Sequence, residues 1–139
     1  MRFYGKVYKD SNFWLAEVPV FDAMTQGRTK KEALLMIGDW FEAMINKPGF
    51  SATIYPANKG EFEVGSEDVR AMIGLLLKRQ REISGLSLAE AAERLGAKSR
   101  NAFARYEHGT SVPSIEKLDH LLRAVSPGRD FVLRQSIAS

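Results

Sequence analysis

The chain has 139 residues, no cysteine and a formal net charge of +3 at pH 7. The lack of cysteine excludes disulfides and thiolate metal sites, and two histidines are too few for a metal site built from imidazoles. No apolar run is long enough to span a bilayer, and the N-terminal residues lack the apolar segment of a signal peptide. We therefore expect a cytoplasmic protein with no membrane segment, no metal and no other cofactor.

The positive charge is unevenly distributed along the chain. Residues 1–65 hold eight basic and eight acidic side chains, whereas residues 66–139 hold twelve basic and nine acidic ones. All of the excess therefore lies in the second half, which favours an anionic partner for that half. A charge of this size is also common on surfaces that bind nothing, so the distribution alone does not decide the function.

The first half alternates apolar and polar residues in short segments, a pattern typical of β-strands. The predicted strands are residues 3–8, 13–18, 23–27, 50–55 and the short segment 61–64. A helix is predicted between the third and fourth of them, because Thr29 and Glu32 have the spacing of a capping box and Pro48–Gly49 is a stop signal. The order predicts a small α+β layer, β-β-β-α-β with a further short strand, with the helix on one face of a sheet.

The predicted helix carries more apolar side chains than one face of a sheet requires. Its main stripe comprises Leu34, Ile37, Phe41, Met44 and Ile45. Met36 and Trp40 flank this stripe, and they belong either to a broad core-facing surface or to a subunit interface. Because domains this small are marginally stable alone, we expect a homodimer or tetramer joined through the first half.

The second half is divided into four predicted helices by capping residues and glycines. They are residues 69–83, 87–95, 99–107 and 114–125, and residues 131–135 predict a last short strand. The change of periodicity places a domain boundary near Gly65–Ser66. The predicted fold is thus α+β, with one domain over residues 1–65 and an all-α domain over residues 66–139.

Two of these helices have the lengths and the intervening turn of a helix-turn-helix, in which the second helix enters the major groove of DNA. Phe103 and Tyr106 share one face of the second helix, so Arg100, Asn101 and Arg105 lie on the opposite face.

Arginine can donate two hydrogen bonds to guanine, and asparagine can pair with adenine in both directions. The same polar face is also what any solvated helix presents, so both interpretations are open. The predicted DNA contacts are Arg100, Asn101, Ala102 and Arg105 for bases, and Ser87, Lys98 and Ser99 for phosphates.

The stretch GLSLAEAAERLGAKSRNAFARYEHGTSVPSIEKLDHLL resembles the helix-turn-helix of XRE-type, lambda-repressor-like proteins. The resemblance implies that Arg81 and Glu107 form a structural salt bridge rather than DNA contacts. It also shows two departures. Leu88 stands where the family usually has a glutamine that helps to hold a phosphate, and Lys98 is an extra residue in the turn.

The first half resembles the HicB antitoxins of type II toxin–antitoxin pairs, through its strand pair, the TQG at 25–27 and the capped helix beginning TKKEAL. That resemblance implies a partial ribonuclease H-like fold without catalytic activity. It further implies that the chain binds and neutralises a HicA-type mRNA-cleaving toxin and represses its own operon by binding double-stranded operator DNA.

Catalysis would need clustered carboxylates, but the available acids, Asp10, Glu17, Asp22 and Asp39, have no spacing that brings them together, so we expect no enzyme. The alternative that stays open is a free-standing dimeric repressor whose N-terminal domain senses a ligand or only dimerises.

Overall fold

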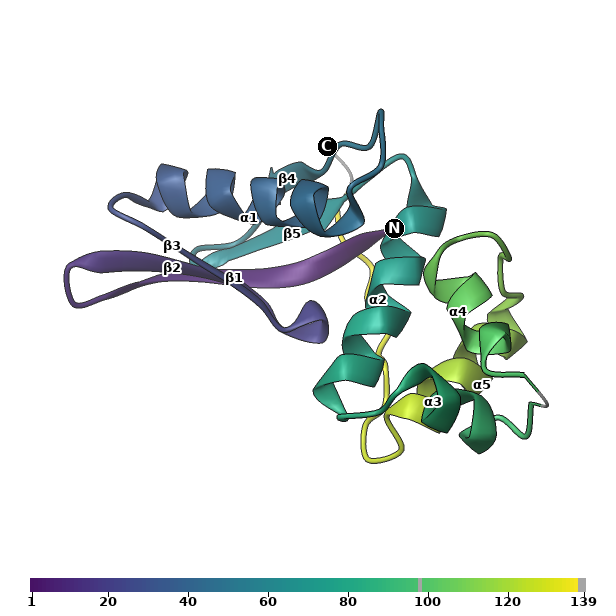
Figure 1. Ribbon diagram of the computed structural model, residues 1–139. Helices are drawn as coiled ribbons and strands as arrows, with labels where there is room; N and C mark the ends of the chain where they lie inside the picture. Colours follow the sequence, from purple (N-terminus) through teal and green to yellow (C-terminus); the bar gives the residue numbers. More distant parts are fainter. Residues whose placement is uncertain (98, 138–139) are drawn as a thin grey trace.

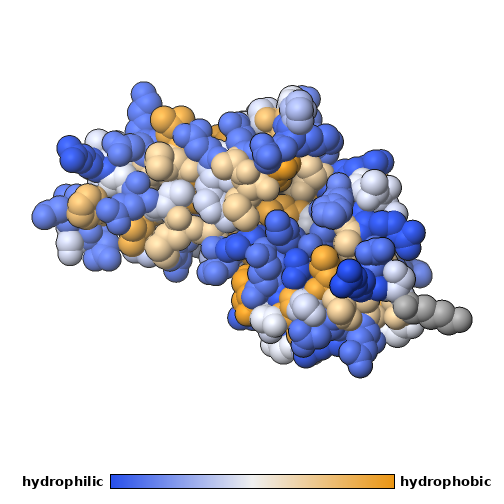
Figure 2. Space-filling model, viewed as in Figure 1, coloured by the Kyte–Doolittle hydropathy of each residue, from blue (hydrophilic) through white to orange (hydrophobic). Residues whose placement is uncertain are grey.

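The computed structural model describes residues 1–97 and 99–137. A five-stranded antiparallel sheet with one helix is followed by four further helices, α2 to α5 (Figure 1). The α+β fold predicted from the sequence is thereby confirmed. Figure 2 shows the same two lobes in space-filling form, with hydrophobic residues interspersed among hydrophilic ones on the face in view.

The sheet has the strand order β3-β2-β1-β5-β4. Its strands are β1 (Arg2–Asp10), β2 (Phe13–Val18), β3 (Ala23–Gly27), β4 (Thr53–Pro56) and β5 (Glu61–Gly65). The register pairs Val7 with Ala16 on β2, and Phe3 with Val64 on β5, so these apolar residues share one face. β4 begins later than predicted, because Ala52 in the preceding loop donates its N–H to the Glu42 carboxylate instead of pairing in the sheet.

Helix α1 (Lys30–Ile45) covers this apolar face (Figure 1). It begins at Thr29, whose hydroxyl oxygen accepts the N–H of Glu32, and it ends at Asn46 in the left-handed conformation. The buried residues of the helix are Ala33, Ile37 and Phe41. They complete an apolar core with Val7, Ala16, Val18, Phe62 and Val64.

Met36 and Trp40, the two residues that suggested a subunit interface, differ in how much of their surface is buried within the chain. Trp40 is half-buried, its ring packs edge-to-face on Phe41, and the guanidinium carbon of Arg79 lies 5.5 Å from its ring centroid. Much of the Trp40 surface is therefore used within the chain. Met36 remains 43% exposed, and the oligomeric state stays a prediction.

A 3-10 turn, η1 (Pro19–Phe21), follows β2 and was not predicted. It carries Phe21 into the core, where the ring lies 4.9 Å from the Phe3 ring and 4.9 Å from the Phe41 ring, edge-to-face with both. This turn thus contributes a central side chain of the N-terminal core.

The second half consists of α2 (Val69–Ile83), α3 (Leu88–Arg94), α4 (Asn101–Glu107) and α5 (Ile115–Val125). The predicted caps are present at Ser87 and Ser114, and Asp68 caps α2 by accepting the N–H of Ala71. Glycines in the left-handed conformation follow α2, α3 and α4. Met72, Ala91, Phe103, Leu121 and Val125 of these helices belong to the same buried apolar cluster as the core under α1.

Helix α2 packs against both halves of the chain (Figure 1). Arg79 donates hydrogen bonds to the carbonyl oxygens of Phe21 (2.7 Å) and Asp22 (3.1 Å), and Gln80 donates to the carbonyl oxygen of Val20 (2.7 Å). Three successive carbonyls after β2 are therefore held by one turn of α2, which fixes the helical half against the sheet.

The prediction of a strand at residues 131–135 is wrong. This segment runs as extended chain past α2 toward the sheet, as the yellow trace in Figure 1 shows. A strand needs a backbone partner, and within residues 1–97 and 99–137 no backbone–backbone hydrogen bond joins residues 131–137 to a neighbour. The apolar side chains of this segment therefore lie in solvent: Val132 is 87% exposed and Leu133 is 92% exposed.

Candidate nucleic-acid interface

Helices α3 and α4, with the turn between them, form the candidate site. The turn begins with Gly96 in the left-handed conformation, and the N–H groups of Gly96 and Ala97 donate to the carbonyl oxygens of Glu93 and Ala92. Helices α3 and α4 are in contact, and the α3 residues Ala91 and Ala92 are small and buried, which permits a close approach. The sequence thus sets both the end of α3 and its distance from α4.

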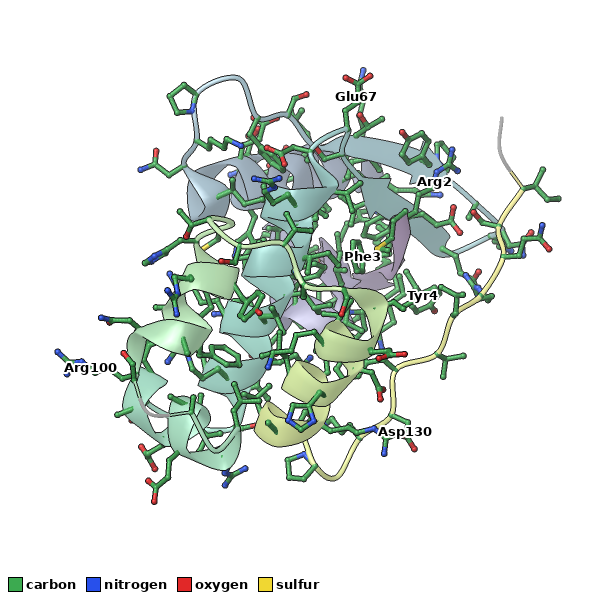
Figure 3. All side chains as sticks on the ribbon, turned by 90° about the vertical axis from the view of Figure 1, so that its right-hand side faces the viewer. Arg2, Phe3, Tyr4, Glu67, Arg100 and Asp130 are labelled. Atoms are coloured by element: carbon green, nitrogen blue, oxygen red, sulfur yellow. The ribbon has the colours of Figure 1, made fainter. Side chains whose placement is uncertain are left out.

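Helix α4 has a buried and an exposed face, as its periodicity predicted. Phe103 is fully buried and Tyr106 is half-buried, whereas Arg100, Asn101 and Arg105 are exposed. Figure 3 shows the Arg100 side chain pointing outward from the rim of the helical half. The structure therefore brings these three polar side chains together on one solvent-facing side of the short helix.

The other predicted DNA contacts near this helix are Ala102, Ser99 and Lys98. Ala102 is half-buried beside the exposed face. The Ser99 hydroxyl oxygen accepts the N–H of Asn101 at 3.2 Å, so it orders the start of α4. Lys98 lies outside the residues that the structure describes.

Both the hydroxyl and the backbone N–H of Ser87 form hydrogen bonds within α3. Its hydroxyl oxygen accepts the N–H of Glu90, and its N–H donates to the Glu90 carboxylate, both at 3.1 Å. The pKa of Glu90 is lowered by the hydrogen bonds from the Ser87 backbone and side chain, so the carboxylate is ionised near neutrality. A phosphate at this position must approach a negative charge, and the Ser87 contact stays a prediction.

An ion pair fastens the end of α4 to α2. Arg81 donates through its Nε to Glu107 Oε2 (2.6 Å) and through a terminal nitrogen to Glu107 Oε1 (3.1 Å), a bidentate arrangement. A third hydrogen bond runs from Arg81 to the carbonyl oxygen of Leu86 (2.9 Å). The Glu107 side chain is only 4% exposed, and the hydrogen bond to it raises the pKa of Arg81. Both side chains are therefore engaged inside the fold and do not project toward a ligand.

Contacts after α4 were not foreseen from the sequence. The Thr110 hydroxyl and the Ser111 N–H both donate to the carbonyl oxygen of Arg105, which closes the helix. Arg70, at the start of α2, donates to the carbonyl oxygen of Gly109 at 3.3 Å. A cation at a helix C-terminus complements the helix dipole, but the contact joins residues that are far apart in the sequence.

A family model described as a helix-turn-helix domain matches residues 73–128. The match includes α3, the turn, α4 and α5. The second half therefore carries a helix-turn-helix domain. Domains of this kind bind DNA and regulate transcription.

The comparison with curated proteins gives no match to this chain. The acids considered for catalysis lie on separate elements: Asp10 ends β1, Glu17 pairs with Lys6 on the sheet, Asp22 follows η1 and Asp39 is on α1. In the part of the chain that the structure describes, no group of three or more histidine, cysteine or acidic residues is arranged to hold a metal ion. None of the described helices is long and apolar enough to cross a membrane.

Proposed function

We propose that this protein is an antitoxin that neutralises a HicA-type mRNA-cleaving toxin and represses its own operon. The helix-turn-helix domain supplies DNA binding, and the N-terminal α+β half supplies toxin binding without catalysis of its own. The observation that carries the DNA-binding part is the exposed side of α4, with Arg100, Asn101 and Arg105 opposite the buried Phe103.

In this proposal α4 lies in a major groove. Arg100 and Asn101 are at its start, where recognition helices contact base edges, and Arg105 is one turn further along. Ala102, half-buried, lies beside this polar side. Of the predicted phosphate contacts, Ser87 caps α3 and Ser99 immediately precedes the N-cap residue of α4, while Lys98 lies outside the described residues.

The DNA-binding part is tested by selecting binding sites from random duplexes and then measuring affinity by fluorescence anisotropy. Arg100→Ala is expected to cost ~1–3 kcal/mol on the selected site and to relax the preference at one base pair. Arg28→Ala, an exposed arginine before α1, is the control and should leave binding unchanged. Equal losses on selected and random DNA would show that the face is only an electrostatic patch.

The toxin-binding part is supported by the sequence resemblance to HicB and by the α+β layer of the N-terminal half. Its test begins by sequencing the bases that flank the gene. The small basic protein encoded by any short reading frame found there is then co-purified with the full chain, and its cleavage of RNA is measured with and without the chain. We expect a stable complex in which cleavage is blocked. A neighbouring ribonuclease that neither binds nor is inhibited would remove this part of the proposal and leave the repressor.

One observation favours the alternative, a free-standing repressor with a ligand-sensing N-terminal domain. A groove of about 330 Å³ lies between the halves and is lined by residues of α1, α2 and the end of α4, among them Met44, Arg70, Lys78 and His108. The lining mixes apolar side chains with the cations of Lys47, Arg70 and Lys78, a combination that suits a small amphipathic anion. A ligand there would contact both domains, and a shift of melting temperature in a screen of organic acids would support this function.

A further inference from the structure

The face of the sheet opposite α1 is not covered by any helix that the structure describes. Side chains on this open face alternate with the core residues, and four apolar ones are strongly exposed: Tyr4 (39%), Tyr8 (36%), Phe13 (42%) and Met24 (53%). Single exposed apolar residues are ordinary, whereas several on one face of three neighbouring strands, here with the ion pair of Lys6 and Glu17 among them, suggest an interaction site.

One segment of the chain lies against this open face. The C-terminal residues reach it, and Arg134 comes within 3.8 Å of a Glu63 carboxylate oxygen while its guanidinium carbon lies 5.2 Å from the Tyr4 ring centroid. In Figure 3 the Tyr4 side chain points toward this yellow segment. An arginine thus occupies a position between a carboxylate and an aromatic ring.

Glu63 is well suited to hold an arginine. It is only 7% exposed, and it also pairs with Arg2 at 3.3 Å. The guanidinium carbon of Arg2 lies 3.5 Å from the Tyr55 ring centroid, so the second arginine repeats the same arrangement. A planar guanidinium combines ion pairing with stacking on a ring, which an ammonium group does less well.

The C-terminal segment is loosely attached. The Arg134 side chain is 57% exposed, and exposed ion pairs of this kind contribute little to stability. The neighbouring Val132, Leu133 and Ile137 are 87%, 92% and 93% exposed, so their side chains do not anchor it. A competing arginine with better apolar contacts can therefore displace this segment at small cost.

We propose that the open face is the docking site of a basic protein partner, which places an arginine on Glu63 and Tyr4 in place of Arg134. The apolar side chains of Tyr8, Phe13 and Met24 then pack against that partner, and the C-terminal segment acts as a removable cover. The identity of the partner as the HicA-type toxin rests on the proposed function, whereas the chemistry of the site does not.

The first experiment measures the affinity of full-length variants for a catalytically inactivated toxin. Tyr8→Ser and Phe13→Ser should weaken binding roughly tenfold or more, as buried aromatic contacts of an interface do. Arg134→Ala should strengthen binding several-fold, because the competing arginine is gone. Leu35→Ser, at a 65% exposed position on α1, is the matched control and should have no effect. Toxin binding that is unchanged in Tyr8→Ser and Phe13→Ser, whether or not Leu35→Ser responds, would overturn the docking site while the antitoxin function stands.

A second probe decides the case in which no toxin binds and the proposed function itself fails. A peptide with the sequence of residues 129–137 is added to the full-length Arg134→Ala chain, and amide chemical shifts are followed by NMR. Shifts confined to β1 and β5 that disappear in Tyr4→Ala would support the site. No shifts, or a dimer that dissociates when Phe13 is changed to serine, would overturn it, the latter because the face would then join two copies of the chain.

Discussion

Helix α1 of the first half and helix α4 of the second half are held in place in different ways. α1 has 16 residues and lies on a sheet, where Ala33, Ile37 and Phe41 become fully buried. α4 has 7 residues and buries only Phe103 and Ala104. It gains a bidentate ion pair from Arg81 to Glu107 and a close approach to α2 at Gly74. A short helix that keeps one side polar has little apolar area to bury, so directional contacts replace area.

The largest expected effect is on the apolar attachment of α1. Phe41→Ala removes a fully buried ring that packs on Phe21 and Trp40, and it should lower the free energy of unfolding by ~3–5 kcal/mol. Leu35→Ala on the outer side of the same helix should change it little, since Leu35 is 65% exposed. Urea unfolding followed by circular dichroism measures both. Equal effects of the two variants would contradict the placement of α1.

The polar attachment of α4 is tested by Glu107→Gln. The variant leaves the Arg81 guanidinium, with a side chain 13% exposed, without its anionic partner, and removal of one partner of a buried pair costs ~3–5 kcal/mol. The glutamine amide still accepts a hydrogen bond, so we expect the lower end of this range.

The control for that variant is Asp119→Asn, which breaks the exposed pair with Arg123 on α5. Thermal unfolding of the full chain should show almost no change for the control. If both variants melt alike, the Arg81–Glu107 pair contributes no more than a surface contact does.

The close approach of α2 and α4 predicts opposite effects for two glycine substitutions. A Cβ on Gly74 would overlap the carbonyl oxygen of Glu107, so Gly74→Ala should destabilise by ~1–3 kcal/mol. A Cβ on Gly38, in the middle of α1, would meet nothing within 4 Å, so Gly38→Ala should stabilise by ~0.5–1 kcal/mol through helix propensity. Chemical unfolding of the two variants gives the signs, and destabilisation by both would contradict this geometry.

The smallest effect concerns pH at the junction of the halves. Asp68 accepts hydrogen bonds from Lys47 (2.6 Å) and from the N–H of Ala71 (3.0 Å), and these contacts lower its pKa. Its contribution to stability is therefore complete above the unfolded-state pKa of ~4 and is lost as the pH falls through the lower folded-state pKa. Asp68→Asn keeps a capping residue but does not titrate. Unfolding in urea at several pH values below 5 should give a shallower pH dependence for the variant than for the native chain.

Local signals were sufficient for most helices and strands. Thr29, Ser87 and Ser114 cap the helices that follow them, because the groups they bond lie three residues away and need no distant partner. The exposed side of α4 was predicted in the same way, since Phe103 and Tyr106 define its buried side through helical periodicity. For this reason the exposed side of α4, with Arg100, Asn101 and Arg105, could be predicted from the sequence alone.

Apart from the Arg81–Glu107 pair, which the family resemblance implied, the contacts between distant residues were missed. The bonds from Arg79 and Gln80 to the carbonyls of Val20, Phe21 and Asp22 join positions 57 to 60 residues apart, and no local pattern indicates them. The prediction of a strand at residues 131–135 was wrong for a related reason, because alternating residues form a strand only when another backbone is available to pair with them.

The sequence by itself determined the elements, their capping and the polar side of α4, because these depend on side-chain spacing within a few residues. Only the tertiary structure decided that α2 joins the two halves, that Glu63 lies between Arg2 and Arg134, and that none of the described helices covers the face of the sheet opposite α1. The physical reason is that a hydrogen bond or ion pair between remote residues forms only after packing has already brought their backbones together.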